Sequence, residues 1–425
     1  MKQTSALLLV PTAVLLVATG CSGDDNTGDP TGAGGNAQGA GGEGTAGTMS
    51  AGGNDGGGGS GTGAAGGGGG TAAEPSSYTL SYGSLLGGNG WERAQGIHVA
   101  NDGSVFLGGN TSSTDFPVTP GAFQTTKLGP TGNAGNSQTG YVVKFDSTGQ
   151  NIQWATYIGG SRRDQVYTVR TDLAGNVYAV GGTGSDDFPT TAGAYDETFN
   201  GPLQFNGLMD VFVAKFDPNG QLLFSTFVGG ATPGEENPRA AIEIDEQRGR
   251  IYVAGLTKAT DFPTTPGSFQ PNYGGGGEDG FVFALSIDGS TLEAATYIGG
   301  SGLDMAFTEI EQHPDGSLYI GGWTTSNDFP ATAGAFQENL AGGRDGWVAR
   351  ISPDLDQLVY ATYLGGDGED AVNHNQGLAI DPNGRAVVIG TTDSSNFPTT
   401  VGAFQESGAG DTDAFITVLL SLIHI

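Results

Sequence analysis

The stretch that decides the fold lies between residues 297 and 337. It contains Tyr-Ile-Gly-Gly at 297–300, Asp-Gly-Ser-Leu-Tyr-Ile-Gly-Gly at 315–322, Asn-Asp-Phe-Pro at 327–330 and Gly-Ala-Phe-Gln at 334–337. The same landmarks recur in register along the chain. The Phe-Pro pair begins at five positions: Phe116, Phe188, Phe262, Phe329 and Phe397. Several landmarks repeated in register predict a repeat protein.

Each repeat contains two predicted β-hairpins. Gly96–Val99 and Val105–Leu107 flank the turn Asn101-Asp102-Gly103, and Asp210–Phe216 and Leu222–Val228 flank a Pro-Asn-Gly turn. Four antiparallel strands in about 70 residues, without helical periodicity, predict one sheet per repeat. Such a sheet buries its faces against copies of itself. We therefore expect an all-β fold, a β-propeller of four-stranded antiparallel blades with five repeats visible. A β-solenoid is the alternative.

The landmarks at 297–337 resemble the SBBP (beta-propeller repeat) family, and the resemblance covers residues 78–419. It implies a β-propeller in an exported bacterial protein, and the family carries no catalytic signature to transfer. Leu256-Thr257-Lys258 departs from the Gly-rich end of the second strand, and Asn396 replaces the acid before Phe397.

The repeats start and end out of phase. Tyr78–Leu86 resembles the fourth strand of a blade, and Phe415–Leu419 resembles a third strand. Pairing of these two segments would close a five-bladed ring. If the chain continues beyond this sequence, further blades follow instead.

The N-terminus resembles that of a bacterial lipoprotein. Lys2 precedes an apolar stretch, and Val17-Ala18-Thr19-Gly20 precedes Cys21 as in a lipobox. We expect a signal peptide at 1–20 and a membrane anchor through lipidated Cys21; an ordinary signal peptide with a chance cysteine is the alternative. Ser22 favours the outer membrane or cell surface of a Gram-negative bacterium.

Two segments flank the repeats. Residues 22–77 contain no aromatic residue, lysine or arginine, so 21–77 is predicted to be a disordered Gly-rich linker. The last six residues, 420–425, can be encoded by the end sequence of transposase-based sequencing libraries. We interpret them as an adapter artefact; a genuine hydrophobic closing strand is the alternative.

Composition excludes several functions. The 45 acidic residues outnumber 15 lysines and arginines, and the resulting charge of −30 disfavours nucleic acid as a partner. One cysteine forms no internal disulfide, and four scattered histidines build no histidine-rich metal cage.

Two sets of repeated side chains are candidate site residues. An acid begins the first strand of every repeat. Calcium is a candidate cofactor, because it binds carboxylates. The alternative is a structural role in which each carboxylate accepts hydrogen bonds from loop amides. The acids are Glu92, Asp164, Glu236, Asp304 and Asp370. We expect them to ring the mouth of the central channel. The phenylalanines of the Phe-Pro pairs are predicted to pack the repeats together.

No catalytic motif is present in the sequence. The predicted function is therefore a cell-surface or outer-membrane lipoprotein whose non-enzymatic propeller binds or scaffolds an unknown extracellular protein or polysaccharide. An extracellular polysaccharide-active hydrolase or lyase and a calcium-stabilised structural module are the alternatives.

Overall fold

Five antiparallel sheets, which we call blades 1 to 5 in chain order, form the folded part of the chain. The computed structural model describes residues 80, 82–130, 138–201, 210–232, 236–237, 241–306, 310–372 and 377–420. All of them belong to the unit Ser77–Ile425. Among these residues no helix is long and apolar enough to cross a membrane.

Blades 1 and 2 are regular four-stranded sheets in which the strands pair in chain order. Blade 1 consists of β1 (Glu92–Val99), β2 (Val105–Thr111), β3 (Thr139–Phe145) and β4 (Ile152–Ile158). Blade 2 consists of β5 (Asp164–Thr171), β6 (Val177–Thr183), β7 (Asp210–Phe216) and β8 (Leu222–Val228).

In blades 3 to 5 the described part of the first strand consists of two short pieces, and both pieces pair with the same neighbour. Blade 3 consists of β9 (Glu236–Asn237), β10 (Ile242–Asp245), β11 (Arg250–Thr257), β12 (Asp279–Ser286) and β13 (Leu292–Ile298). Blade 4 consists of β14 (Asp304–Ala306), β15 (Glu311–Gln312), β16 (Leu318–Thr324), β17 (Asp345–Ile351) and β18 (Leu358–Leu364). Blade 5 consists of β19 (Asp370–Val372), β20 (Leu378–Ile380), β21 (Ala386–Thr392) and β22 (Asp413–Leu419).

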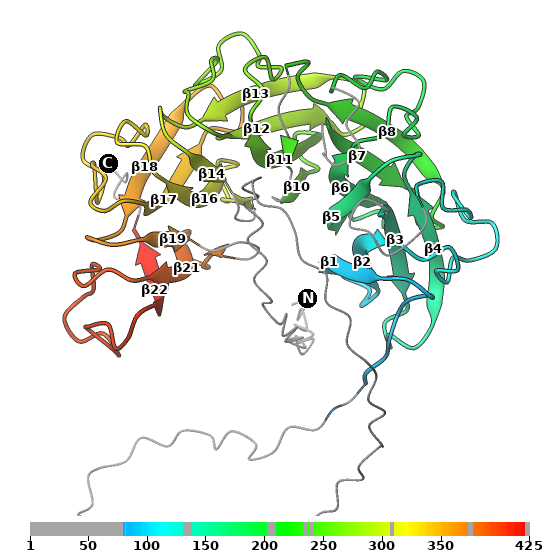
Figure 1. The fold of residues 1–425 in the computed structure, drawn as a ribbon, viewed down its shortest axis with the longest axis horizontal. Helices are drawn as coiled ribbons and strands as arrows, with labels where there is room; N and C mark the ends of the chain where they lie inside the picture. Colours follow the sequence, from blue (N-terminus) through cyan, green and yellow to red (C-terminus); the bar gives the residue numbers. More distant parts are fainter. Residues whose placement is uncertain are drawn as a thin grey trace, which may run out of the picture. The chain divides into compact units, whose positions relative to one another are not determined.

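The blades follow one another along an arc, with the first strand of each blade on the inner side (Figure 1). The all-β, propeller-type fold predicted from the repeats is confirmed. Its core lies between neighbouring blades. Val142 of blade 1, for example, belongs to the same buried cluster as Val166 and Phe212 of blade 2. Similar clusters join blades 2 and 3, blades 3 and 4, and blades 4 and 5.

The hairpin of β7 and β8 shows why the sequence folds in this way. The Asp217 carboxylate accepts hydrogen bonds from the backbone amides of Asn219 and Gln221, at 2.8 and 2.9 Å. Gly220 has a φ of 81°, a left-handed conformation that favours glycine. The turn is therefore specified locally, and both strands have the predicted boundaries.

The long loop between the second and third strands of each of blades 1 to 4 lies against the outer edge of that blade. In blade 1 the Thr119 amide donates to the carbonyl of Ala155 at 3.0 Å, and the Tyr157 amide donates to the carbonyl of Gln124 at 3.1 Å. Equivalent pairs occur in blades 2, 3 and 4. The loops thus satisfy backbone groups that an outer strand would otherwise expose.

The predicted strand Tyr78–Leu86 does not form in the residues described. Leu80 and residues 82–86 have no strand structure, and Leu80 and Leu85 are largely exposed. At the other end of the arc, β22 pairs only with β21. Within the described residues, the predicted pairing between these two segments is therefore not observed.

Candidate functional site

The acids that begin the first strands are held within their own blades. The Asp164 carboxylate accepts hydrogen bonds from the Thr183 hydroxyl at 2.6 Å, the Ser185 hydroxyl at 3.1 Å and the Gly160 amide at 2.8 Å. Asp304 accepts the same three kinds of bond from Thr324, Ser326 and Gly300.

The pattern holds, with variations, in two other blades. Asp370 accepts hydrogen bonds from Ser394 and Gly366, and Glu92 accepts them from Thr111 and Ser113. Glu236 begins β9, but its side chain lies outside the described part of the structure.

Three of these carboxylates, Asp164, Asp304 and Asp370, are fully buried, which differs from the expected position at a channel mouth. Glu92 is half-buried. Burial raises the pKa of Asp164 to about 7, although the hydrogen bonds from Thr183 and Ser185 oppose the shift. Burial likewise raises the pKa of Asp304. A Thr-x-Ser pattern at the end of the second strand supplies the two hydroxyl groups that bind each acid. Our sequence reasoning missed this signal.

A second set of buried acids begins the third strands, and sequence reasoning missed it too. Asp210, Asp279 and Asp345 are fully buried, and each accepts a backbone amide from the loop before it. Asp413 does the same in blade 5 but is partly exposed, since no further sheet covers it. In blade 1 the position is occupied by Thr139.

The two sets of acids meet at the junctions between blades. A methyl group placed on Gly299 would lie 2.8 Å from Asp279 Oδ1 of blade 3 and 3.0 Å from Asp304 Oδ2 of blade 4. A methyl group on Gly365 would lie 2.6 Å from Asp345 Oδ1 of blade 4 and 2.8 Å from Asp370 Oδ2 of blade 5. Each pair of carboxylates therefore shares one small space, which only a glycine leaves open.

Each of these pairs has a carboxylate oxygen without a hydrogen-bond partner. Asp279 Oδ1 and Asp370 Oδ1 are buried and unpartnered, as is Asp210 Oδ1 in blade 2. Burial raises the pKa of Asp279 to about 7, and the negative charge of Asp304 adds to the shift. Burial also raises the pKa of Asp345, with Asp370 acting in the same direction.

The junction between blades 1 and 2 has a different charge arrangement. A methyl group on Gly129 would lie 3.1 Å from Thr139 Oγ1 and 3.4 Å from Lys127 Nζ. Lys127 is buried and donates a hydrogen bond to the carbonyl of Pro130 at 2.6 Å. Burial lowers the pKa of Lys127 to about 8, while the negative charge of Asp164 opposes that shift. One carboxylate and one ammonium thus occupy this junction.

The phenylalanines of the Phe-Pro pairs each stack on an aromatic ring of the third strand in their own blade. Phe116, Phe188, Phe262 and Phe329 are buried, and Phe397 is partly buried. The ring centroids of the five pairs are 4.4–4.9 Å apart; the pairs are Phe116–Tyr141, Phe188–Phe212, Phe262–Phe281, Phe329–Trp347 and Phe397–Phe415. These rings anchor the long loop to its own sheet and have no exposed face for a ligand.

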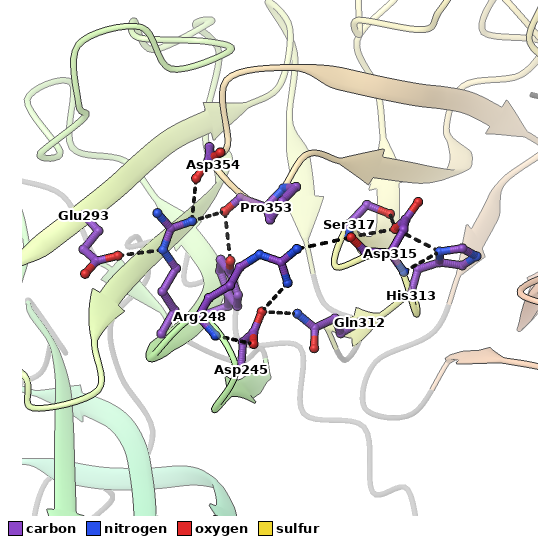
Figure 2. Close-up of polar contacts among 11 residues, drawn as sticks. Asp245, Arg248, Glu293, Gln312, His313, Asp315, Ser317, Pro353 and Asp354 are labelled. Atoms are coloured by element: carbon purple, nitrogen blue, oxygen red, sulfur yellow. Dashed lines mark hydrogen bonds and ion pairs between the residues drawn. The ribbon is translucent and has the colours of Figure 1, made fainter.

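The opposite face, which carries the short hairpin turns, has one elaborate polar network between blades 3 and 4 (Figure 2). Arg250 donates to Glu293 Oε2 at 2.6 Å, Asp354 Oδ1 at 2.7 Å and the carbonyl of Pro353 at 2.9 Å. The Tyr252 hydroxyl also donates to the Pro353 carbonyl. The bonds to Pro353 and Asp354 tie β11 to the last turn of blade 4, whereas the bond to Glu293 on β13 lies within blade 3.

The second half of this network surrounds Asp245 and Asp315. Arg248 pairs with Asp245 at 2.8 Å and donates to the carbonyl of Asp315 at 3.2 Å, while Gln312 donates to Asp245 at 2.6 Å. Burial would raise the pKa of Asp245, but the hydrogen bonds from Arg248 and Gln312 hold that pKa below its usual value. Both acids thus have charged partners, so the network serves to join two blades.

Among the described residues, the carboxylate pairs at the blade junctions are the candidates for holding a metal. This part of the chain contains no group of three or more His, Cys, Asp or Glu side chains arranged for a metal ion. The predicted lipidation site Cys21, the whole predicted linker at 21–77 and residues 421–425 lie outside the described residues.

The repeat itself is identified by comparison with known families. The family model described as "Beta-propeller repeat" (SBBP) matches residues 153–189, from β4 to the Phe188-Pro189 pair. The chain carries an SBBP repeat. The resemblance seen in the sequence is confirmed, and the matched SBBP repeat includes Asp164, Thr183 and Ser185, which form the buried contact described above.

Several solved structures are similar to this SBBP-repeat chain. A protein of unknown function from Dyadobacter fermentans is 12% identical, with 74% of this chain and 79% of that chain covered and a TM-score of 0.38. A GH43 beta-xylosidase/alpha-arabinofuranosidase from a compost metagenome is 10% identical, with 78% and 91% covered and a TM-score of 0.32. No curated protein matches the chain.

Proposed function

We propose that this chain is an exported lipoprotein, anchored at the outer membrane or cell surface through Cys21, whose propeller binds or scaffolds an extracellular protein or polysaccharide without enzymatic activity. The anchor is supported by the lipobox-like sequence before Cys21, and the Gly-rich segment at 22–77 suits a tether between membrane and propeller.

The observation that carries the non-enzymatic part is the repetition of the buried acid contact. Asp164 and Asp304 have the raised pKa values that a general acid needs, but both side chains are fully buried. A substrate cannot reach them. Their Thr and Ser partners also recur from blade to blade, as expected of a structural contact, whereas a catalytic constellation is expected in one blade.

The anchor and the propeller are tested separately. Metabolic labelling with palmitate should label the native protein and not Cys21→Ser, and the variant should move from the membrane fraction to the soluble fraction. Equal membrane retention of both proteins would contradict the anchor.

For the propeller, the purified protein is incubated with extracellular polysaccharides and cell-wall material. We expect retention on a ligand without release of products. Catalytic release of sugars or unsaturated products would overturn the non-enzymatic function.

A further inference from the structure

The starting observation is an unbalanced charge at two blade junctions. Asp279 and Asp304 lie together between blades 3 and 4, and Asp345 and Asp370 lie together between blades 4 and 5. All four side chains are fully buried. Two buried carboxylates strongly oppose each other's ionisation unless a positive charge compensates them.

The junction between blades 1 and 2 shows how this protein balances the same position. There Thr139 replaces the acid of the third strand, and the ammonium group of Lys127 lies beside it. Lys127 is the third residue after Gln124, and the equivalent positions after Gln270 and Gln337 are Tyr273 and Leu340. The lysine is thus absent at both junctions that contain two carboxylates.

An unpartnered oxygen at the junction between blades 3 and 4 points to what takes the place of the lysine there. Asp279 Oδ1 is buried, accepts no hydrogen bond and is the Asp279 oxygen that approaches Asp304 over Gly299. Asp328 and the Tyr273 phenol, which act on the same pair, are acids and supply no positive charge. Asp279 Oδ1 is therefore free to act as a ligand to a cation.

Backbone oxygens extend the donor set of this junction. A methyl group on Gly274 would lie 2.5 Å from the carbonyl oxygen of Gly300 and 3.1 Å from both Gly299 O and Asp279 Oδ2. Carboxylate and carbonyl oxygens together are the donors that calcium prefers. At the junction between blades 4 and 5, by contrast, the oxygens that approach each other, Asp345 Oδ1 and Asp370 Oδ2, already accept hydrogen bonds from backbone amides.

We propose that the junction between blades 3 and 4 binds a divalent cation of the calcium class, held by Asp279 with Asp304. The cation takes the role that Lys127 has at the first junction and makes stacking of these two blades dependent on calcium. With two carboxylates in the site, the expected Kd is about 0.1–1 mM, as in extracellular calcium modules.

The test compares thermal unfolding of the full-length chain at pH 8 in EGTA and in 5 mM calcium chloride. Without metal, the two buried carboxylates of this junction oppose each other's charge. A cation that binds only the folded chain raises its stability, so we expect calcium to raise Tm by roughly 3 °C or more.

Three variants separate a metal site from a structural role. Asp279→Asn should lose the bound calcium in equilibrium dialysis and should raise the metal-free Tm at pH 8, because one charge of the pair is gone. Asp345→Asn, at the junction between blades 4 and 5, is the matched control and should keep the bound calcium. Tyr273→Lys places an ammonium group at the position equivalent to Lys127 and should make the junction between blades 3 and 4 independent of calcium.

Two results would overturn the proposal. If calcium neither binds nor raises Tm, the pair holds a shared proton and no metal. If calcium binds equally to wild type and to Asp279→Asn, the ion lies elsewhere.

Discussion

Replacement of Phe329 by alanine should strongly destabilise blade 4. The Phe329 side chain is 4% exposed, and its ring lies 4.9 Å from that of Trp347 and 5.7 Å from that of Tyr363. Truncation of a buried phenylalanine to alanine costs about 3–5 kcal/mol, and loss of the two ring pairs places this site in the upper half of that range. We expect about 4 kcal/mol.

The chain offers two matched controls for this prediction. Phe397 occupies the same position in blade 5 and stacks on Phe415 at 4.5 Å, but it is only partly buried, so its truncation should cost less. Phe404 is fully exposed, and Phe404→Ala should change the free energy of unfolding by less than about 0.5 kcal/mol.

The assay is equilibrium unfolding in urea, followed by tryptophan fluorescence, since Trp347 lies beside the mutated ring. The expected order of destabilisation is Phe329→Ala, then Phe397→Ala, then Phe404→Ala. If Phe329→Ala costs no more than Phe404→Ala, the Phe-Pro ring does not anchor its loop, and the packing role is wrong.

Three further changes test other parts of the fold. Gly267→Ala should cost about 1–2 kcal/mol in urea unfolding, because Gly267 has a φ of 85° with no atom within 4 Å of an added methyl group; Gly267→Asn should recover part of it. Arg250→Ala removes a bond to Glu293 within blade 3 and bonds to Asp354 and the Pro353 carbonyl of blade 4, and it should lower stability by about 1–3 kcal/mol; Arg250→Lys should not restore it, because lysine lacks the planar fork. Ile416 is 73% exposed on β22, an edge strand among the described residues, so Ile416→Lys should raise the monomer fraction in light scattering, whereas Leu223→Lys on the covered strand β8 should not.

The hairpins could be predicted from the sequence because their determinants are local. The boundaries predicted for β7 and β8 are the observed ones, since the Asp-Pro-Asn-Gly turn places its own hydrogen bonds and Gly220 supplies the left-handed conformation. The same holds for the repeat length, which follows from the spacing of the Phe-Pro pairs.

The strand at Tyr78–Leu86 could not be predicted reliably because a strand needs a partner. Its sequence matches the fourth strands of the other blades, but no third strand lies beside it among the described residues.

The acid pairs could not be predicted because they depend on contacts between blades. Asp279 and Asp304 belong to different repeats, and their approach over Gly299 requires both the register of each sheet and the stacking of the two blades. Sequence repetition identified Asp304 as a candidate but gave no reason to select Asp279. The Thr-x-Ser pattern would have shown how Asp304 is held, and only the structure shows that Asp279 faces it.

The face that carries the hairpin turns also shows how one repeat replaces a cation that it lacks, as Lys127 does at the junction between blades 1 and 2. Lys144, Lys215 and Arg350 lie 4.7–5.4 Å from the aromatic ring opposite them in blades 1, 2 and 4. Blade 3 has Ala284 opposite Tyr252, and there Arg250 supplies the cation to that face.

A chain that restores a cation where one repeat lacks it is not expected to leave a buried carboxylate pair with a free oxygen uncompensated. The junction at Asp279 with Asp304 is such a pair within the described residues. An ion from the medium would restore the balance there, and it would also make the stacking of blades 3 and 4 respond to calcium.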